Sequence, residues 1–175
     1  MFIRLSPVRQ NAKGQNMKWR LLTGRRVPDV LAFVFDAAKD GQEVNIGTDS
    51  LQTGRHTQFC TVIAILTPGK GGRVVYSREV VPRITSLRER LSKEVWASVT
   101  IAMSLAPRLA ERVTVHIDAN PEPRFKSAEY VQNLVGMVVG QGFRSVIKPY
   151  AWAASHAADH IVRTQGLLPR HEDAA

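Results

Sequence analysis

Residues 44–81 read VNIGTDSLQTGRHTQFCTVIAILTPGKGGRVVYSREVV, and this stretch decides the fold. It contains three apolar runs rich in β-branched residues, which are the residues typical of strands: 44–49, 57–66 and 73–81. The second and third runs are separated by PGKGG (68–72), which is typical of a loop. Three strands in succession with short connections predict an antiparallel meander.

After the meander the pattern alternates between helix and strand. The elements predicted there are a helix, a strand, a helix, a strand and a helix, over 86–106, 113–118, 126–139, 143–147 and 150–163. Ser86 and Glu89 fit a capping box at the start of the first helix, and Pro107 is expected to end it. A short helix over 28–39 precedes the meander. This order predicts an α/β fold, with a mixed five-stranded sheet that is antiparallel in the meander, parallel across the βαβ units and flanked by helices.

Length and composition exclude several classes of protein. The chain has 175 residues, of which 44% are hydrophobic and 22% charged, as expected for one globular domain. No apolar run reaches the roughly 18–20 residues needed to cross a bilayer, so no association with a membrane is expected. The first residues lack the pattern of a secretory signal, and Cys60 is the single cysteine, which excludes an intrachain disulfide. We therefore expect a cytoplasmic protein.

The net charge of +9 is divided unevenly along the chain. Residues 1–28 carry seven basic side chains and no acidic one, whereas the rest of the chain carries seventeen basic and fifteen acidic ones. We predict a basic N-terminal arm over 1–27, a domain over 28–165 and a polar tail over 166–175. Such arms bind polyanions by releasing counterions, although a merely solubilising tail would look the same. The candidate nucleic-acid contacts in the arm are Arg20, Arg25 and Arg26.

Four acidic residues lie outside the turns and polar helix faces where most acids are found. Asp49 closes an apolar strand in NIGTDS, and Asp118 closes another in VHIDAN. An acid at the end of a strand faces the crevice beyond the carboxyl ends of the sheet, where α/β folds place ligands. Asp159 lies in an Ala-rich helix whose small side chains would allow close packing on the sheet, which would bring this acid toward the same crevice.

Glu94 is placed by helical spacing. At 100° per residue it falls about 20° from Leu87 and Leu105, in the middle of the apolar stripe, while Glu89 points away. Burial of an acid is costly unless the acid is paired or bound to a metal, so we expect a cation to meet Glu94.

Converging carboxylates without cysteines or paired histidines are hard oxygen ligands, suited to Mg²⁺ or Mn²⁺. Each acid also has a purely structural explanation. Asp49 and Asp118 could form turns at strand ends, Glu94 could pair with an arginine, and Asp159 could be solvated. Because all four would converge on one edge of the sheet, we favour a shared site.

Several sequence blocks together resemble the ribonuclease H-like superfamily and, within it, the YkuK-type group of bacterial proteins. These blocks are IGTDS (46–50), LRERLSKEVWAS (87–98), HIDAN (116–120), GMVVGQGF (136–143) and KPYAWAASHAADH (148–160). The resemblance covers about residues 44–163. It implies a ribonuclease H-like fold, as does the order of the predicted elements.

The resemblance also implies a nuclease that holds two Mg²⁺ or Mn²⁺ ions between four carboxylates and hydrolyses phosphodiesters. Carried over by position, Asp49 is the bridging ligand, Glu94 and Asp118 are its partners, and Asp159 is the fourth ligand. Two ions about 4 Å apart can activate a water and stabilise the leaving oxygen.

Three auxiliary residues are predicted near the site, each with a structural alternative. His156 would assist product release or be a surface histidine. Lys148 would contact the scissile phosphate or be an ordinary exposed lysine. Asn120 would be an outer ligand or simply begin a turn. His116 shares the strand face of Asp118 and is expected to be packed rather than to bind a metal.

The substrate is left open among RNA, an RNA–DNA hybrid and branched DNA, and a homodimer is possible. The alternative function is a nucleic-acid-binding protein of the same fold with little or no turnover. The intact acids favour the enzyme. A phosphotransferase related to actin-like ATPases is disfavoured, because the chain has no glycine-rich phosphate loop followed by a helix.

Overall fold

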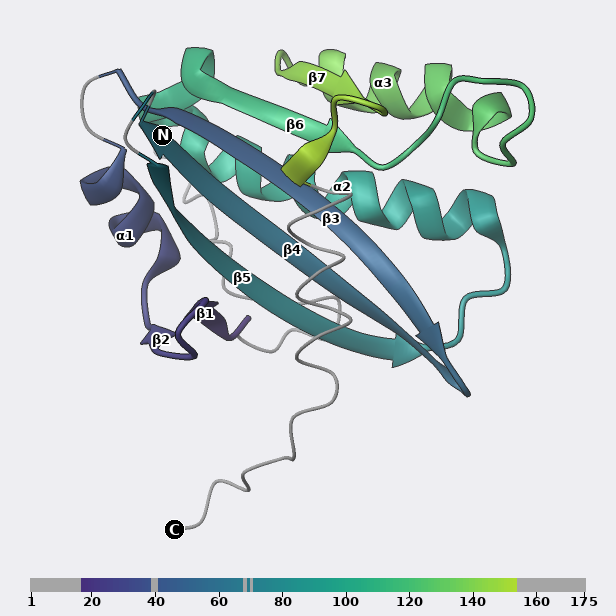
Figure 1. The fold of residues 1–175 in the computed structure, drawn as a ribbon, viewed down its shortest axis with the longest axis horizontal. Helices are drawn as coiled ribbons and strands as arrows, with labels where there is room; N and C mark the ends of the chain where they lie inside the picture. Colours follow the sequence, from purple (N-terminus) through teal and green to yellow (C-terminus); the bar gives the residue numbers. More distant parts are fainter. Residues whose placement is uncertain (1–16, 39–40, 68, 70, 154–175) are drawn as a thin grey trace, which may run out of the picture.

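The computed structural model of the protein describes residues 17–38, 41–67, 69 and 71–153. Their strands form one mixed sheet in the order β2-β1-β5-β4-β3-β6-β7 (Figure 1). The strands are β1 (Trp19–Leu21), β2 (Arg26–Val27), β3 (Glu43–Thr53), β4 (His56–Thr67), β5 (Gly71–Pro82), β6 (Val113–Ile117) and β7 (Arg144–Ile147). The α/β class and the mixed sheet are therefore confirmed.

The predicted meander is formed by β3, β4 and β5, which pair antiparallel along their whole lengths. These strands are longer than predicted, because the β3–β4 ladder continues to Thr53 and His56 and closes through a two-residue turn. Gly54 in that turn has φ of 55°, a conformation that favours glycine. Asp49 therefore lies inside β3, and the prediction that it ends the strand is wrong.

Two crossover helices connect the parallel strands. β3 pairs with β6, and β6 with β7, both in parallel. The helices within the described residues are α1 (Val30–Ala37), α2 (Leu87–Leu109) and α3 (Val131–Val139), with short 3₁₀ turns η1 (Ala110–Arg112) and η2 (Ala128–Tyr130). None of them is long and apolar enough to cross a membrane.

Helix α2 begins where the sequence predicts and ends later. The Ser86 side chain accepts a 3.2 Å hydrogen bond from the backbone N–H of Glu89, which confirms the cap. The expected end before Pro107 is wrong, since the helix runs to Leu109. The proline costs one backbone hydrogen bond in the last turn, and the helix ends two residues later.

The sheet has two strands more than the five predicted. β1 pairs antiparallel with the edge of β5, and β2 pairs with β1, so Trp19 to Val27 form a small ribbon on the sheet. The side chains of Trp19 and Val27 are buried in the main core. Strands of two and three residues are too short to show a hydrophobic period, and their arginines hid them within the basic arm.

The main core lies between the sheet and α2, which runs behind β3 and β6 in Figure 1. Alternate residues of β3, such as Val44 and Ile46, contact this core together with Val99 and Leu105 of the helix. The opposite face of the sheet carries a small buried cluster around Cys60, with Val62 and Tyr76. One face of β3 therefore packs against α2 and the main core, and the other face lies beside the Cys60 cluster. Which face a residue of β3 occupies decides what its side chain can contact.

Candidate active site

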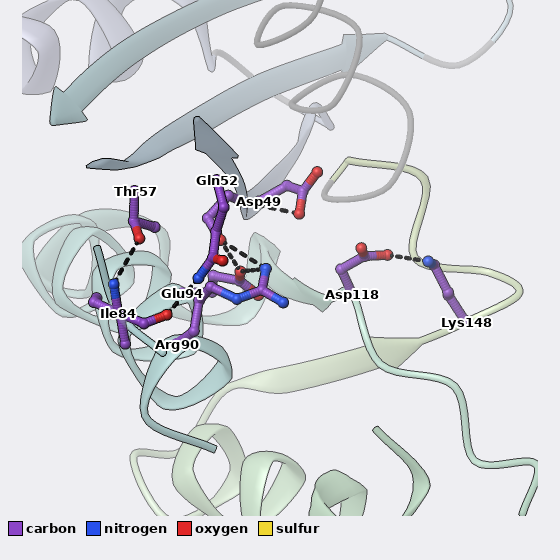
Figure 2. A network of polar contacts seen from close by, with 9 residues as sticks. Asp49, Gln52, Thr57, Ile84, Arg90, Glu94, Asp118 and Lys148 are labelled. Carbon is purple, nitrogen blue, oxygen red and sulfur yellow. Dashed lines mark hydrogen bonds and ion pairs between the residues drawn. The ribbon is translucent and has the colours of Figure 1, made fainter. Parts of the chain in front are cut away.

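Asp49 and Asp118 lie where two neighbouring strands separate. The parallel ladder between β3 and β6 runs from Val44 opposite Val113 to Gly47 opposite His116, and no pair follows. Asp49 and Asp118 each lie two residues further on, so each shares the sheet face of the last paired residue on its strand. The two carboxylates therefore lie on one face of the sheet, at the opening between the strands. Figure 2 shows both side chains together with Glu94.

Glu94 reaches this opening from α2, on the other face of the sheet. Its side chain is only 4% exposed, which confirms the predicted burial. The Ser50 hydroxyl donates a 2.6 Å hydrogen bond to Glu94 Oε1, and Arg90 Nη1 lies 3.6 Å from the same oxygen. Arg90 also donates a 3.0 Å hydrogen bond to Ser50 Oγ. The cation expected beside Glu94 is thus Arg90, which lies one helical turn earlier in α2.

The three acids are electrostatic neighbours. The pKa of Glu94 is raised to about 8, first by burial and then by the charge of Asp49, with a smaller contribution from Asp118. The Ser50 hydrogen bond and the Arg90 charge act in the opposite direction and are outweighed. A nearby cation therefore stabilises the ionised form of a buried carboxyl among like charges more than that of an exposed carboxyl.

Asp118 is paired with Lys148, whose ammonium lies 2.7 Å from Oδ1. This oxygen is buried and has no aligned hydrogen-bond donor among the described residues, so the contact is chiefly an ion pair. Lys148 directly follows β7, and its backbone N–H donates to the Ala119 carbonyl at 3.2 Å. The lysine predicted as an auxiliary residue is therefore held at the site by the β6–β7 pairing.

Asn120 makes the hydrogen bonds of a turn, and its role as an outer ligand stays a prediction. Its side-chain oxygen accepts a 3.0 Å hydrogen bond from the Glu122 backbone N–H, and its own N–H donates to Ser127 Oγ at 3.0 Å. These bonds fix the loop after β6, and that loop delays the next helix, which begins at Val131 instead of 126.

His116 is packed, as expected. It is buried, Nε2 lies 2.9 Å from Asn45 Oδ1, and its ring meets the Trp152 ring edge-on with centroids 5.3 Å apart. Burial lowers the pKa of His116 to about 4, so the ring is neutral at physiological pH. Asp159 and His156 lie outside the described residues, and their assignments remain predictions.

Strand register places basic side chains on the Asp49 face. Directly opposed residues of paired strands share a face, so the pairing of Asp49 with Cys60, and of Cys60 with Arg78, carries this face across the sheet. Arg20 of β1 lies opposite Tyr76 of β5, two residues along from Arg78, and so belongs to the same face. At about 4.8 Å per strand, Arg20 is roughly 14 Å from Asp49 across the sheet.

The other two arginines predicted to contact nucleic acid belong to the same ribbon. Arg26 is the register partner of Arg20, and Arg25 is exposed in the turn before it. Arg20 uses one guanidinium nitrogen to hold the Gly24 carbonyl at 3.0 Å, which closes this turn. The three side chains therefore gather at the β1–β2 edge of the sheet.

The donor atoms near the opening fit a hard divalent cation in type, because they are carboxylate oxygens. Within the part of the chain that the structure describes, no three acids, histidines or cysteines are gathered closely enough to hold an ion. Instead, Arg90 lies 3.6 Å from Glu94 Oε1, and Lys148 forms an ion pair with Asp118. A metal would therefore have to displace these cations and draw the carboxylates closer together than they lie in this structure.

Sequence reasoning missed Ser50 and Arg90. Arg90 could have been found, because it lies four residues before Glu94 and so on the same side of the helix. Ser50 gives no such signal. Only the register of β3 shows that the residue after Asp49 turns to the α2 face, where it meets Glu94.

The fold is that of a ribonuclease H-like protein. The family model described as Ribonuclease H-like matches residues 26–163, so the chain belongs to this family. The chain is also similar to the uncharacterized protein YkuK of Bacillus subtilis (strain 168), with 26% identity over 149 residues, covering 75% of this chain and 86% of YkuK. No match was found among solved structures.

Proposed function

We propose that the protein is a nuclease that depends on Mg²⁺ or Mn²⁺ and hydrolyses phosphodiester bonds of nucleic acid. The observation that carries this proposal is the meeting of Asp49, Glu94 and Asp118 where β3 and β6 separate. These three residues would hold the metal, with Asp159 as the fourth ligand by family resemblance. Two bound ions would supply an activated water and stabilise the leaving oxygen.

The surrounding side chains prepare the carboxylates for this task. Ser50 and Arg90 hold the Glu94 carboxyl in place. Both contact Glu94 Oε1, and Arg90 also donates a hydrogen bond to Ser50 Oγ. Lys148 forms an ion pair with Asp118, and a metal bound at this carboxylate would replace that pair. The Lys148 ammonium would then lie beside the site, where it could bind the negative phosphate of the substrate.

The substrate we propose is RNA, an RNA–DNA hybrid or branched DNA. Nucleic-acid binding would use Arg20, Arg25, Arg26 and Lys148. The two arginines on the Asp49 face, Arg20 and Arg26, support a contact with phosphates continuous with the carboxylates. A homodimer remains a proposal, to be tested by light scattering of the purified protein.

A second function is favoured by one specific observation. In the structure two of the three carboxylates are occupied by internal cations, Arg90 and Lys148. A protein that binds nucleic acid with little or no turnover would keep these ion pairs permanently. The metal dependence of cleavage separates the two functions.

The test uses four labelled probes: an RNA–DNA hybrid, duplex DNA, single-stranded RNA and a four-way DNA junction. Each is incubated with the protein in Mn²⁺ or in EDTA, beside the variants Asp49→Asn and Glu43→Gln. Glu43 is an exposed acid at the other end of β3 and serves as the matched control. We expect cleavage in Mn²⁺ that Asp49→Asn abolishes and Glu43→Gln retains. Salt-sensitive binding without cleavage of any probe would favour the second function.

A further inference from the structure

The strands of the meander continue well beyond the carboxylates. From Asp49, β3 runs four more residues to Thr53, which at about 3.4 Å per residue is roughly 14 Å. There it pairs with His56 of β4, and His56 pairs with Pro82 of β5, so the three strands end together. Figure 1 shows this end as a narrow projection past α2. We call its basic residues, Arg55, His56 and Arg83, the basic tip.

The basic tip is held rigidly by hydrogen bonds between the hairpin and the segment after β5. The Arg83 backbone N–H donates to the Arg55 carbonyl at 2.9 Å, and Arg83 Nη1 donates to the Gly54 carbonyl at 2.9 Å. The Ile84 backbone N–H donates to Thr57 Oγ1 at 2.9 Å. Gln52 completes the connection with a bond from its amide to the Ile84 carbonyl, visible in Figure 2. The backbones of Arg55 and Arg83 are therefore fixed beside each other.

The charge of the basic tip is not neutralised by its surroundings. Arg55, His56 and Arg83 are exposed, and no acid of the described residues forms an ion pair with either arginine. Two exposed arginines whose backbones are held side by side at the end of a rigid hairpin can both reach a single anion. The arrangement suits phosphate, which arginine recognises with several N–H donors.

Among the described residues, the strand face that leads from Asp49 to the basic tip carries no further acid. On the Asp49 face, the next row of paired residues is Leu51, Gln58 and Val80, and the row after it is Thr53, His56 and Pro82. Val80 is 52% exposed, and Gln58 is partly exposed. A nucleic-acid backbone on this strip would meet uncharged side chains first and then the arginines.

We propose that Arg55 and Arg83, assisted by His56, bind backbone phosphates of the nucleic-acid substrate on the side of the carboxylates away from the β1–β2 ribbon. The inference rests on the proposed function and adds a second phosphate contact to it. The roughly 14 Å from Asp49 to the end of β3 corresponds to about four base-pair steps of a duplex. The substrate would thus be held on both sides of the reacting phosphodiester.

The test measures binding in EDTA, so that cleavage plays no part. The probes are fluorescein-labelled duplex DNA and RNA–DNA hybrid, titrated by anisotropy at several salt concentrations with the full chain. The test variant is Arg55→Glu/Arg83→Glu. The matched control is Arg73→Glu/Arg144→Glu, because both of these arginines are exposed at the opposite end of the sheet.

We expect the test variant to lose about tenfold or more in affinity and to lower the slope of log K against log salt by about two, one for each lost phosphate contact. The control should change affinity less than about twofold. Arg55→Glu alone gives a second measurement, since the described contact of Arg55 uses only its backbone carbonyl and we expect this variant to fold. Equal effects of the test and control variants would overturn the inference.

Failure of the inference is distinguishable from failure of the proposed function. Wild-type protein that binds neither probe would overturn both. Tip-dependent binding in EDTA without cleavage in Mn²⁺ would support the basic tip and overturn the nuclease.

Discussion

Asp49 and Asp118 occupy equivalent positions on neighbouring parallel strands, each two residues beyond the last pair of the ladder, Gly47 and His116. Hydrogen bonds between the strands end where the acids begin, so the strands are free to part and admit Glu94 from the helix behind them. Asp49 and Asp118 on one face of the sheet, and Glu94 on the other, therefore lie close enough for the two aspartates to raise the pKa of Glu94. This relationship makes the opening unfavourable for the metal-free protein and attractive to a cation.

The repulsion predicts that Asp49→Asn stabilises the metal-free protein. The charge of Asp49 raises the pKa of Glu94, so its removal relieves repulsion once Glu94 ionises. We expect a rise in Tm of about 2–4 °C above pH ~8, the change that roughly 1 kcal/mol produces in a chain of this size, and a smaller rise near pH ~5. Differential scanning fluorimetry in EDTA measures this, with Glu43→Gln as the control that should not respond. A stabilisation independent of pH would contradict the prediction.

The raised pKa of Glu94 predicts how stability depends on pH. Its folded-state pKa, about 8, exceeds the ordinary value of 4.5, so between these values the folded state binds the proton more tightly. The contribution of Glu94 is therefore fully present below about pH 4.5 and is lost as pH rises through about 8. Glu94→Gln keeps a hydrogen-bond acceptor for Ser50 and cannot ionise. In EDTA, the Tm of this variant minus that of the wild type should grow across this range and then level off. A difference in Tm that does not change with pH would contradict the prediction.

Patterns of hydrophobicity were sufficient to predict the meander, both crossovers and the burial of Glu94. These features depend on local periods, which a single sequence displays. The position of Asp49 was predicted wrongly because the chain beyond it, SLQT, has a single apolar residue, Leu51, which is too little to show an alternation. The strand continues there through pairing with β4, which is a non-local interaction. The two short N-terminal strands depend in the same way on the exposed edge of β5.

The candidate site shows the same division. Glu94, Asp118 and Lys148 were recognised from their places on elements, and the structure brings all three to the strand opening. What the sequence could not show is that Lys148 pairs with Asp118. Ion pairs depend on side-chain direction and on register between distant strands, and several lysines and arginines would satisfy the same pattern.

Cys60 predicts a chemical probe of the sheet centre. It is fully buried on β4 opposite Asp49. Burial raises the pKa of its thiol to about 12, and the charge of Arg78, which acts in the opposite direction, is outweighed. The thiolate is the reactive form, so the folded protein should resist Ellman's reagent. Unfolding in guanidinium chloride should release one reactive thiol for each chain, which serves as the control. Rapid labelling of the folded protein would show that the strands around the site open.

Lys148 predicts a competition between the protein's own cation and a metal. Its ammonium lies 2.7 Å from Asp118 Oδ1, where an ion bound by this carboxylate would have to approach. Lys148→Met removes the charge while keeping an apolar stem of similar length, so Mn²⁺ should bind about two- to fivefold more tightly, consistent with the modest strength of a partly exposed ion pair. Isothermal titration with Mn²⁺ or the loss of its free electron-paramagnetic-resonance signal measures the Kd without any substrate. Lys93→Met is the matched control, since Lys93 pairs with the exposed Glu89 on the solvent side of α2. Unchanged Mn²⁺ affinity in Lys148→Met would mean that Asp118 is not a ligand, whereas tighter binding combined with slower cleavage would place this lysine at both the metal and the phosphate.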